Sequence, residues 1–426
     1  MRILLINAPV SRPSPHSMLS PPLGLEYIAS TLATEGHDVD GVDLNLSWER
    51  PYDLERLIAR VAPRMVGISA HTETFPAALV VARRIKAVDS RVKVVLGGPH
   101  PTILPQDALA DSAVDFVVRG EGEMAMAELA RAIAGEGDLG QIKGLAYRDG
   151  NGLKLNHPGE LISPDKLTPP ARHLFPEEFY ETSWSVLAAR GGCPFRCPFC
   201  SASAIWGGRR MQRSVESVVR ETEDLVIKYE ADYIFFVDDI FTLNKRWVYQ
   251  LCRLLEKDGS SLRWGCATRV DMVDEDLLRC MAEAGCRAVQ FGVESGSQRV
   301  LDLVKGIKKE QVLAAIEAAT NFGIDVAASF MVPFPEDTPE TLQETKEFMR
   351  EVQRSGGRIL LSFTTPFPGT YLFEHAEELG LRILASGWEE YDAKHNILET
   401  GYLSSRQIGA FITGLADELG LQQVIQ

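Results

Sequence analysis

Short apolar runs alternate with helical patterns along the first 140 residues. Five runs rich in Val, Ile and Leu end in Gly, Pro or polar residues and predict β-strands at 2–9, 37–45, 65–72, 93–100 and 115–123. Apolar residues at helical spacing predict helices between them at 23–36, 53–63, 75–89 and 124–137. This alternation is typical of a parallel, doubly wound sheet. Ligands of such sheets bind beyond the carboxyl ends of the strands.

The same alternation begins again near residue 184. Further strands are predicted at 184–192, 232–239, 263–269, 288–295, 325–333 and 359–367. Helices are predicted at 214–229, 246–257, 275–284, 309–322, 338–352 and 371–379. Six such units are fewer than the eight of a closed barrel, so we predict a partial (β/α)6 barrel of the TIM type. The fold class is α/β throughout.

Residues 140–182 separate the two alternating regions. The stretch "GLAYRDGNGLKLN" predicts a β-hairpin, and the Pro-rich remainder cannot sustain a helix or a central strand. After the barrel, "SSRQIGAFITGLADELGLQ" combines a Ser cap with helical spacing. We therefore expect four regions, which are listed here in chain order: a Rossmann-like domain at 1–139, a hairpin and connector at 140–182, the partial barrel at 183–400 and a C-terminal helix at 401–426.

Composition and charge narrow the class of protein. Of the 426 residues, 45% are hydrophobic and 24% are charged, as in an ordinary globular protein. The formal net charge of −15 argues against a nucleic-acid partner held by phosphate contacts. The basic run "GGRRMQR" at 207–213 fits the edge of a cavity or a solvated face. Because no apolar run is long enough to cross a membrane and the N-terminus lacks signal-peptide features, we expect a soluble, cytoplasmic protein.

Three of the seven cysteines cluster in "GGCPFRCPFC", where Cys193, Cys197 and Cys200 follow the first barrel strand. An odd number of cysteines, three of them clustered, does not indicate a disulfide framework. A zinc site would need a fourth Cys or His, and residues 185–215 contain none. Three thiolates leave one iron of a four-iron cluster open for another ligand. The other four cysteines lie in predicted helices or strands, where we expect them to pack: Cys252, Cys266, Cys280 and Cys286.

This motif and the barrel that follows it resemble the radical S-adenosylmethionine (radical SAM) superfamily. The resemblance implies a [4Fe–4S] cluster on the three cysteines, with SAM on the open iron. It also implies a set of SAM contacts at the strand ends, which are Phe199 for the adenine, Asp238 for the amino group in preference to Asp239, Arg269 for a carboxylate or ribose, and Glu294 and Ser295 for the ribose. One departure is Pro333, which stands where the family usually has glycine.

The loops of the first domain resemble the cobalamin-binding Rossmann-like domain. That resemblance places Ser69 beside the nucleotide tail of cobalamin and Gly97 and Gly98 at the family's glycine pair. We also assign cobalamin contacts to Gly120 and Glu121 in "RGEGE". The family's Asp-x-His-x-x-Gly motif is absent, so the resemblance implies no histidine ligand to cobalt from that motif. His71 follows the third strand, and we do not assign it to the metal.

Together the two resemblances identify the chain as a member of the cobalamin-dependent radical SAM enzymes. The function we expect is methylation of an unactivated carbon through methylcobalamin and a 5′-deoxyadenosyl radical. A cyclisation, rearrangement or oxidation with the same cofactors is the alternative, and a non-catalytic cobalamin or redox sensor is a second. The expected partners are a small-molecule substrate and an electron donor of flavodoxin or ferredoxin type. The substrate is not readable; Trp388 and Tyr391 are expected to pack on the barrel.

Overall fold

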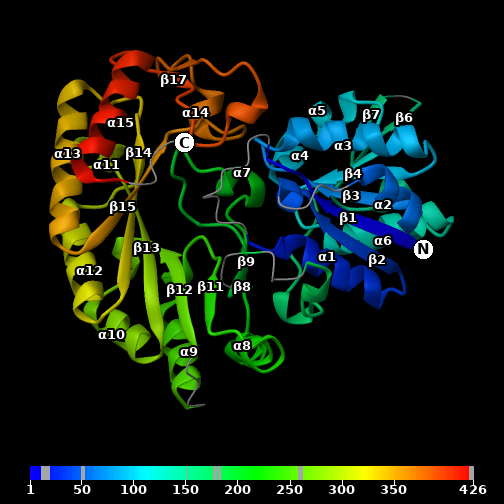
Figure 1. The fold of residues 1–426 in the computed structure, drawn as a ribbon, viewed down its shortest axis with the longest axis horizontal. Coiled ribbons are helices and arrows are strands. Elements are labelled where there is room, and N and C mark those ends of the chain that lie inside the picture. The colour runs from blue at the N-terminus through cyan, green and yellow to red at the C-terminus, as the bar shows by residue number, and fades with distance from the viewer. Residues whose placement is uncertain are drawn as a thin grey trace. The chain divides into compact units, whose positions relative to one another are not determined.

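The computed structural model describes residues 1–10, 20–48, 53–150, 152–175, 180, 184–257 and 262–421 (Figure 1). The chain divides into two compact units. Unit 1 comprises Met1–Thr182, Ala204–Met211 and Gly387–Glu389, and unit 2 comprises Ser183–Ser203, Gln212–Ser386 and Glu390–Gln426.

Unit 1 is built on a seven-stranded sheet of order β2-β1-β3-β4-β5-β6-β7. Its strands are β1 (Arg2–Asn7), β2 (Asp38–Asp43), β3 (Met65–Ser69), β4 (Lys93–Gly97), β5 (Phe116–Val118), β6 (Leu145–Asp149) and β7 (Gly152–Leu155). The first five run parallel, as predicted, while β6 and β7 are antiparallel. The predicted hairpin therefore extends the sheet, and segment 140–182 contributes two strands to unit 1.

Helices cover both faces of this sheet. They are α1 (Leu23–Thr34), α2 (Leu54–Val61), α3 (Phe75–Val88), α4 (Pro99–Ile103), α5 (Pro105–Ala110) and α6 (Glu123–Ala134). Successive residues of β1 enter different cores, because side chains alternate across a strand: Leu4 and Ile6 join one cluster, and Ile3 and Leu5 join the other. The helices α4 and α5 are absent from our predictions. Each begins with a proline, which reads as a breaker in sequence but is suited to a first helical turn.

Unit 2 is built on a six-stranded sheet of order β15-β14-β13-β12-β11-β8, and all its pairs are parallel. This confirms the predicted partial barrel of six strands. The strands are β8 (Trp184–Val186), β11 (Tyr233–Phe236), β12 (Arg263–Thr268), β13 (Cys286–Glu294), β14 (Asp325–Val332) and β15 (Gly357–Phe363). Four short strands lie outside this sheet: β9 (Ala189–Gly191), β10 (Arg210–Gln212), β16 (Arg382–Ile383) and β17 (Leu398–Glu399). The run predicted as one strand at 184–192 thus divides into β8 and β9.

Most of the helices along this part of the chain match the predicted ones, but two were not predicted and one predicted helix needs correction. The helices are α7 (Ala202–Trp206), α8 (Val215–Tyr229), α9 (Lys245–Lys257), α10 (Glu275–Glu283), α11 (Gln298–Val304), α12 (Lys309–Asn321), α13 (Pro339–Arg354), α14 (Tyr371–Glu374) and α15 (Ser405–Leu419). Of these, α7 and α11 were not predicted. The prediction of a helix at 371–379 was wrong, since α14 ends at Glu374 and turns follow. Two further carboxylates, Glu377 and Glu378, would lie at the negative end of a longer helix. The predicted Ser cap of α15 is confirmed, with Ser404 accepting from the Gln407 N–H.

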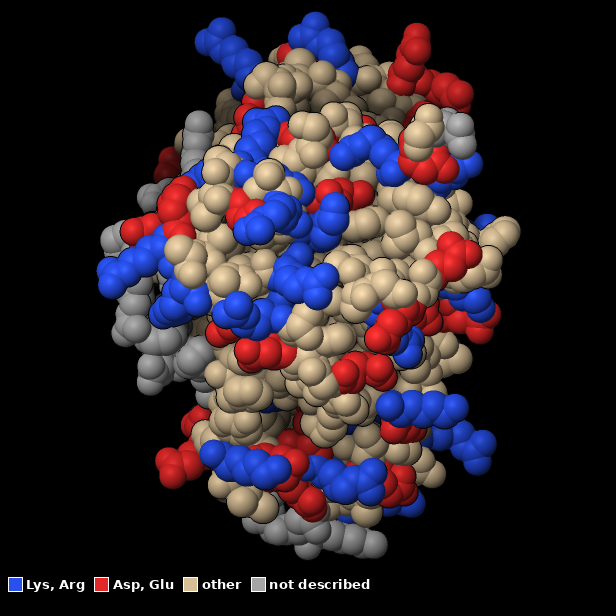
Figure 2. Space-filling view, turned by 90° about the vertical axis from the view of Figure 1, so that its right-hand side faces the viewer, with Lys and Arg blue, Asp and Glu red and all other residues tan. Residues whose placement is uncertain are grey.

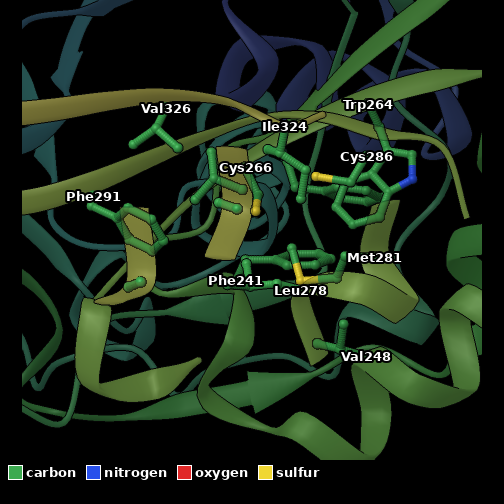
Figure 3. Packing of buried hydrophobic residues seen from close by; sticks show 14 of the residues in the cluster. Phe241, Val248, Trp264, Cys266, Leu278, Met281, Cys286, Phe291, Ile324 and Val326 are labelled. Atoms are coloured by element: carbon green, nitrogen blue, oxygen red, sulfur yellow. The ribbon is translucent and has the colours of Figure 1, made fainter. Parts of the chain in front are cut away.

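The core of unit 2 lies between its sheet and helices (Figure 3). Trp264 is fully buried, and its indole N–H donates to the Ala284 carbonyl at 2.8 Å. Three of the four cysteines predicted to pack are buried in this core, and Cys280 packs against it partly exposed. These thiols occupy positions that small hydrophobic residues take elsewhere.

The face drawn in Figure 2 carries both basic and acidic side chains, with Lys and Arg gathered across its centre and left and Asp and Glu beside them. Of the helices that the structure describes, none combines the length and the apolar character needed to cross a membrane.

Candidate functional site

The three clustered cysteines lie in the loop that follows β9, and each is partly buried. The loop is tightly turned, because the Cys200 N–H donates to the Cys197 carbonyl at 3.1 Å. Glycine at 191 has φ of 85°, a left-handed conformation that suits a residue without a Cβ where the strand enters the loop. The predicted placement of the motif after the first barrel strand is therefore what the structure shows.

The segment before this loop is held by hydrogen bonds on both sides of Ala188. Its N–H donates to Asp238 Oδ2 at 2.8 Å. Its carbonyl accepts from the Arg213 N–H at 2.9 Å and from Gln212 Nε2 at 2.7 Å. Arg213 also donates through Nη1 to the Leu187 carbonyl at 2.9 Å. These bonds fix the backbone from which the cysteine loop departs.

Burial disfavours a free thiolate at each of the three cysteines. It raises the pKa of the Cys200 thiol to about 11 and raises the pKa of Cys193 and Cys197 as well. The carboxylate of Asp239 adds to the rise at Cys193 and Cys200, whereas the cations of Lys305 and Arg269 oppose the rise in the pKa of Cys197. Both carboxylates and cations therefore act on the cysteine loop: Arg269 also opposes the rise in the pKa of Cys193, and Glu294 adds to the rise at Cys197.

The donor set of this loop fits an iron–sulfur cluster. Thiolates are the usual ligands of such clusters, and three of them leave one iron open. In the part of the chain that the structure describes, no group of three His, Cys, Asp or Glu side chains surrounds a point as the ligands of a single ion would. A four-iron cluster does not require that arrangement, because each thiolate binds a different iron.

Arg269 follows β12 and turns its guanidinium toward this loop. It lies 3.9 Å from the ring centroid of Phe195, and its Nη1 lies 3.8 Å from the Cys197 sulfur. Nε and Nη2 donate to the two carboxylate oxygens of Asp271, each at 2.9 Å. Burial is the largest influence on the pKa of Arg269 and lowers it, but the hydrogen bond and charge of Asp271, together with Cys197 and Cys193, raise the pKa on balance. Arg269 is therefore a buried cation held against the cysteine loop.

Glu294 and Ser295 lie at the end of β13, as predicted. Glu294 has φ of 78°, a strained conformation of the kind that collects at functional sites. Its Oε1 accepts from Lys305 Nζ at 2.6 Å. The Ser295 hydroxyl accepts from the Ser297 N–H at 3.1 Å and lies 3.3 Å from Thr345 Oγ1. Both side chains are buried and already hydrogen-bonded within the protein.

Phe199 lies between Pro198 and Cys200 and packs on the loop after β14. Its ring meets Phe334 edge to face, with centroids 5.6 Å apart, and borders a small cluster with Val300 and Val304. Phe199, which is predicted to face the adenine, is thus half-buried against a small apolar cluster and does not belong to the main core of unit 2.

The two carboxylates after β11 differ in their surroundings. Asp238 is 4% exposed and binds the Ala188 N–H, whereas Asp239 is exposed and its charge acts on Cys193 and Cys200. The sequence pattern favours Asp238 as the SAM contact, and in the structure Oδ2 of Asp238 accepts from the backbone of the segment before the cysteine loop. The sequence cannot separate the two, because either neighbour of a strand end can turn toward the site.

We expect Asp238→Ala to lower the free energy of unfolding by about 1–3 kcal/mol, because the buried Ala188 N–H loses its acceptor. The iron retained per chain falls with it. Asp238→Asn keeps an acceptor oxygen and restores most of both. Thermal unfolding and iron analysis after anaerobic reconstitution measure these effects. If both variants kept the stability and iron content of the wild type but lost SAM cleavage, Asp238 would be a SAM ligand and not a structural residue.

The residues predicted to bind cobalamin gather at the carboxyl ends of the parallel strands of unit 1. Ser69 ends β3 and Gly97 ends β4, and these positions are paired in register. Gly98 has φ of 94°, and a Cβ there would lie 2.7 Å from the Ala70 carbonyl oxygen and 3.1 Å from Ser69 Oγ. Glycine is therefore required where the turn after β4 packs on the end of β3.

Gly120 and Glu121 line a pocket of about 250 Å³ in unit 1. A Cβ at Gly120 would meet nothing within 4 Å, so the backbone there faces open space. The pocket is completed by other residues of unit 1: Thr102, Arg119, Pro158, Gly159, Glu160, Leu161, Ala204, Ile205, Trp206, Gly207 and Arg209. Gly207 and Arg209 belong to the basic run predicted as the edge of a cavity or a solvated face, and both line this pocket. The pocket thus combines an open backbone at Gly120 with apolar side chains such as Leu161 and Trp206 and with charged ones such as Arg119 and Glu121.

Of the two aromatic residues expected to pack on the barrel, Tyr391 is buried in unit 2 and Trp388 is not part of that unit. Trp388 belongs to unit 1, where it packs on a core cluster and meets the His100 ring edge to face at 5.0 Å; its expected packing on the barrel was wrong. Trp388 begins a short 3-10 helix that ends at Glu390, and no local pattern in the sequence indicates that this residue packs in unit 1. His100, whose ring contacts Trp388, is buried, and this burial lowers its pKa to about 4. His71 lies in the loop after β3, where its side chain is exposed.

Comparisons with known proteins agree with this division of the chain. A model of the B12 binding domain matches residues 18–130, and a model of the radical SAM superfamily matches residues 190–349. The chain is 33% identical to an uncharacterized methyltransferase of Pyrococcus horikoshii, over 97% of this chain and 91% of that protein. It is 30% identical to an anaerobic magnesium-protoporphyrin IX monomethyl ester cyclase of Rubrivivax gelatinosus, over 87% of this chain and 68% of that protein.

A solved structure has the same fold. The radical S-adenosylmethionine methyltransferase TsrM from Kitasatospora setae, solved with cobalamin and a [4Fe–4S] cluster, superposes with a TM-score of 0.76 at 21% identity, over 97% of this chain and 88% of that one. A B12 binding domain takes cobalamin, and a radical SAM domain takes a [4Fe–4S] cluster and SAM. The chain belongs to the cobalamin-dependent radical SAM enzymes, with a B12-binding domain followed by a radical SAM domain.

Proposed function

We propose that this protein is a C-methyltransferase that acts on an unactivated carbon of a small molecule. The observation that carries the proposal is the similarity to the Pyrococcus horikoshii protein, which is named a methyltransferase and is matched over nearly its whole length. When bound, the cluster and SAM supply a carbon radical for hydrogen abstraction, and cobalamin supplies a methyl group. The electron comes from a donor of flavodoxin or ferredoxin type.

The cysteine loop would hold the cluster through Cys193, Cys197 and Cys200. We propose that Phe199 borders the adenine of SAM, because it is fixed beside Cys200 on an apolar wall. Asp239 is the better acceptor for the SAM amino group, since its carboxylate is exposed on the side of Cys193 and Cys200. Asp238 then holds the backbone that carries the loop.

The ribose of SAM is proposed to lie at the end of β13. Glu294 uses Oε1 for Lys305, which leaves Oε2 to accept from a ribose hydroxyl. The hydroxyl of Ser295 accepts one backbone N–H and is proposed as the second contact. On the other sheet, Ser69, Gly97, Gly98, Gly120 and Glu121 are proposed to hold cobalamin. The support is their common place at the carboxyl ends of parallel strands.

A cyclase reaction is the second candidate, and one observation favours it: the 30% identity to a magnesium-protoporphyrin IX monomethyl ester cyclase. The two functions differ in their use of SAM. Methyl transfer by this route consumes one SAM as methyl donor and a second as radical source. A cyclase needs SAM only as radical source.

The stoichiometry of SAM products separates the two functions. Reconstituted protein with cobalamin, a reductant and SAM labelled in its methyl group is incubated with a small-molecule extract. We expect label in a carbon-bound methyl group, with S-adenosylhomocysteine and 5′-deoxyadenosine formed in equal amounts. Formation of 5′-deoxyadenosine without S-adenosylhomocysteine or methyl incorporation would favour the cyclase and overturn the proposal.

A further inference from the structure

The guanidinium of Arg269 is almost fully occupied by protein atoms. Arginine has five N–H donors. Nε donates to one oxygen of Asp271, and Nη2 donates to the other oxygen and to the Lys305 carbonyl at 3.1 Å. One N–H of Nη1 is directed at the Cys197 sulfur. A single N–H remains, which is too few for the two-bond grip that arginine usually offers a carboxylate.

The contacts of Arg269 orient its charge toward the cysteine loop. The side chain of Arg269 is 6% exposed, so solvent screens it little. Its plane lies over Phe195, two residues from Cys193 and from Cys197. Asp271 holds the guanidinium in one orientation through two parallel hydrogen bonds. The arrangement is that of a fixed cation rather than of a mobile ligand-binding side chain.

Lys305 places a second cation near the same sulfur. Its ammonium donates to Glu294 Oε1 at 2.6 Å and to the Gly292 carbonyl at 2.7 Å. Its carbonyl also accepts from Arg269, so the two basic residues are linked directly. No sequence pattern singles out Lys305, which lies eleven residues after Glu294 in the chain.

We propose that Arg269 acts on the cluster rather than on SAM: it donates an N–H to the sulfur of Cys197, and its charge stabilises the reduced cluster. Reduction takes one electron from a flavodoxin- or ferredoxin-type donor, which is oxidised, and changes the cluster from the 2+ to the 1+ state. The added negative charge is the one that a nearby fixed cation favours. Arg269 therefore raises the reduction potential of the cluster. This inference rests on the cluster of the proposed function.

A redox titration of the reconstituted protein, followed by electron paramagnetic resonance of the reduced cluster, tests the role of Arg269. We expect Arg269→Gln to lower the ratio of reduced to oxidised cluster about tenfold at the wild-type midpoint, a shift of about 59 mV for one electron. Asp271→Asn removes a negative charge beside the guanidinium and is expected to shift the potential the opposite way. A merely structural role would move both variants in the same direction.

Arg263→Gln is the matched control: it makes the same substitution at the start of the strand that precedes Arg269, where Arg263 pairs with Asp232 at the surface. It is expected to leave the potential unchanged. The inference is overturned if Arg269→Gln holds a full cluster at the wild-type potential, or if both site variants shift it alike. A wild-type protein that binds no cluster would instead overturn the proposed function, so the two failures are distinguishable.

Discussion

Replacement of Cys200 by serine is expected to abolish SAM cleavage, with a loss of at least about 100-fold, and to reduce the iron bound per chain. Iron must displace the proton of this buried thiol, whose pKa is raised to about 11. A serine hydroxyl is far harder to deprotonate and is a poor ligand for iron in a cluster. Release of 5′-deoxyadenosine and iron analysis under anaerobic conditions measure the loss.

Cys280→Ser is the matched control for this variant. Cys280 is also partly exposed and lies in the same unit, but it packs against the core on α10, outside the cysteine loop. Its iron content and SAM cleavage should equal those of the wild type. If Cys200→Ser kept both at the wild-type level, the three-thiolate cluster would be wrong.

Replacement of Gly98 by alanine is expected to disrupt cobalamin binding and to destabilise unit 1. A left-handed conformation costs a residue with a Cβ about 1–3 kcal/mol. In addition the new methyl group would lie 2.7 Å from the Ala70 carbonyl oxygen, which is backbone and cannot move aside easily. The end of β3 must shift, and Ser69 shifts with it. Cobalamin retained after gel filtration and the midpoint of thermal unfolding measure the effect.

Two neighbouring glycines serve as controls for Gly98. Gly97→Ala places its Cβ 3.5 Å from the Val118 carbonyl, an ordinary contact, and should be tolerated by the fold. Gly120→Ala has the conformational cost without a clash, because its φ is 80° and its surroundings are open. Stability should therefore fall in the order Gly97→Ala, Gly120→Ala, Gly98→Ala. Full cobalamin binding and full stability in Gly98→Ala would contradict the close packing of Gly98 on the end of β3.

The fold was predictable because local patterns and topology agree. The alternation of apolar strands with amphipathic helices indicates a parallel sheet in each unit. Strand β1 shows the reason, because its alternate residues pack in the cores on the two faces of the sheet. The features that the hydrophobic pattern failed to predict depend on single residues or on contacts between distant parts of the chain. Prolines at the starts of α4 and α5 resemble breaks, and Trp388 returns to unit 1 from more than two hundred residues downstream of its sheet.

The candidate site was predictable in part. The cysteine spacing identifies the loop, and polar residues at strand ends identify Arg269 and Glu294. Their partners were not predictable. Asp271 lies two residues after Arg269, but Lys305 follows a short helix whose apolar residues Val300, Leu301 and Val304 say nothing about where the next side chain points. The choice between Asp238 and Asp239 depends on which one turns inward to Ala188, and that is a property of the folded strand end.

The most direct test of the central claim measures cofactors and SAM cleavage in one sample. The protein is reconstituted anaerobically with iron, sulfide and cobalamin and then freed of unbound material. We predict a [4Fe–4S] cluster and cobalamin bound to the same chain, and formation of 5′-deoxyadenosine from SAM only when a reductant is added. Protein that retains cobalamin but binds no cluster and leaves SAM intact under reducing conditions would contradict it.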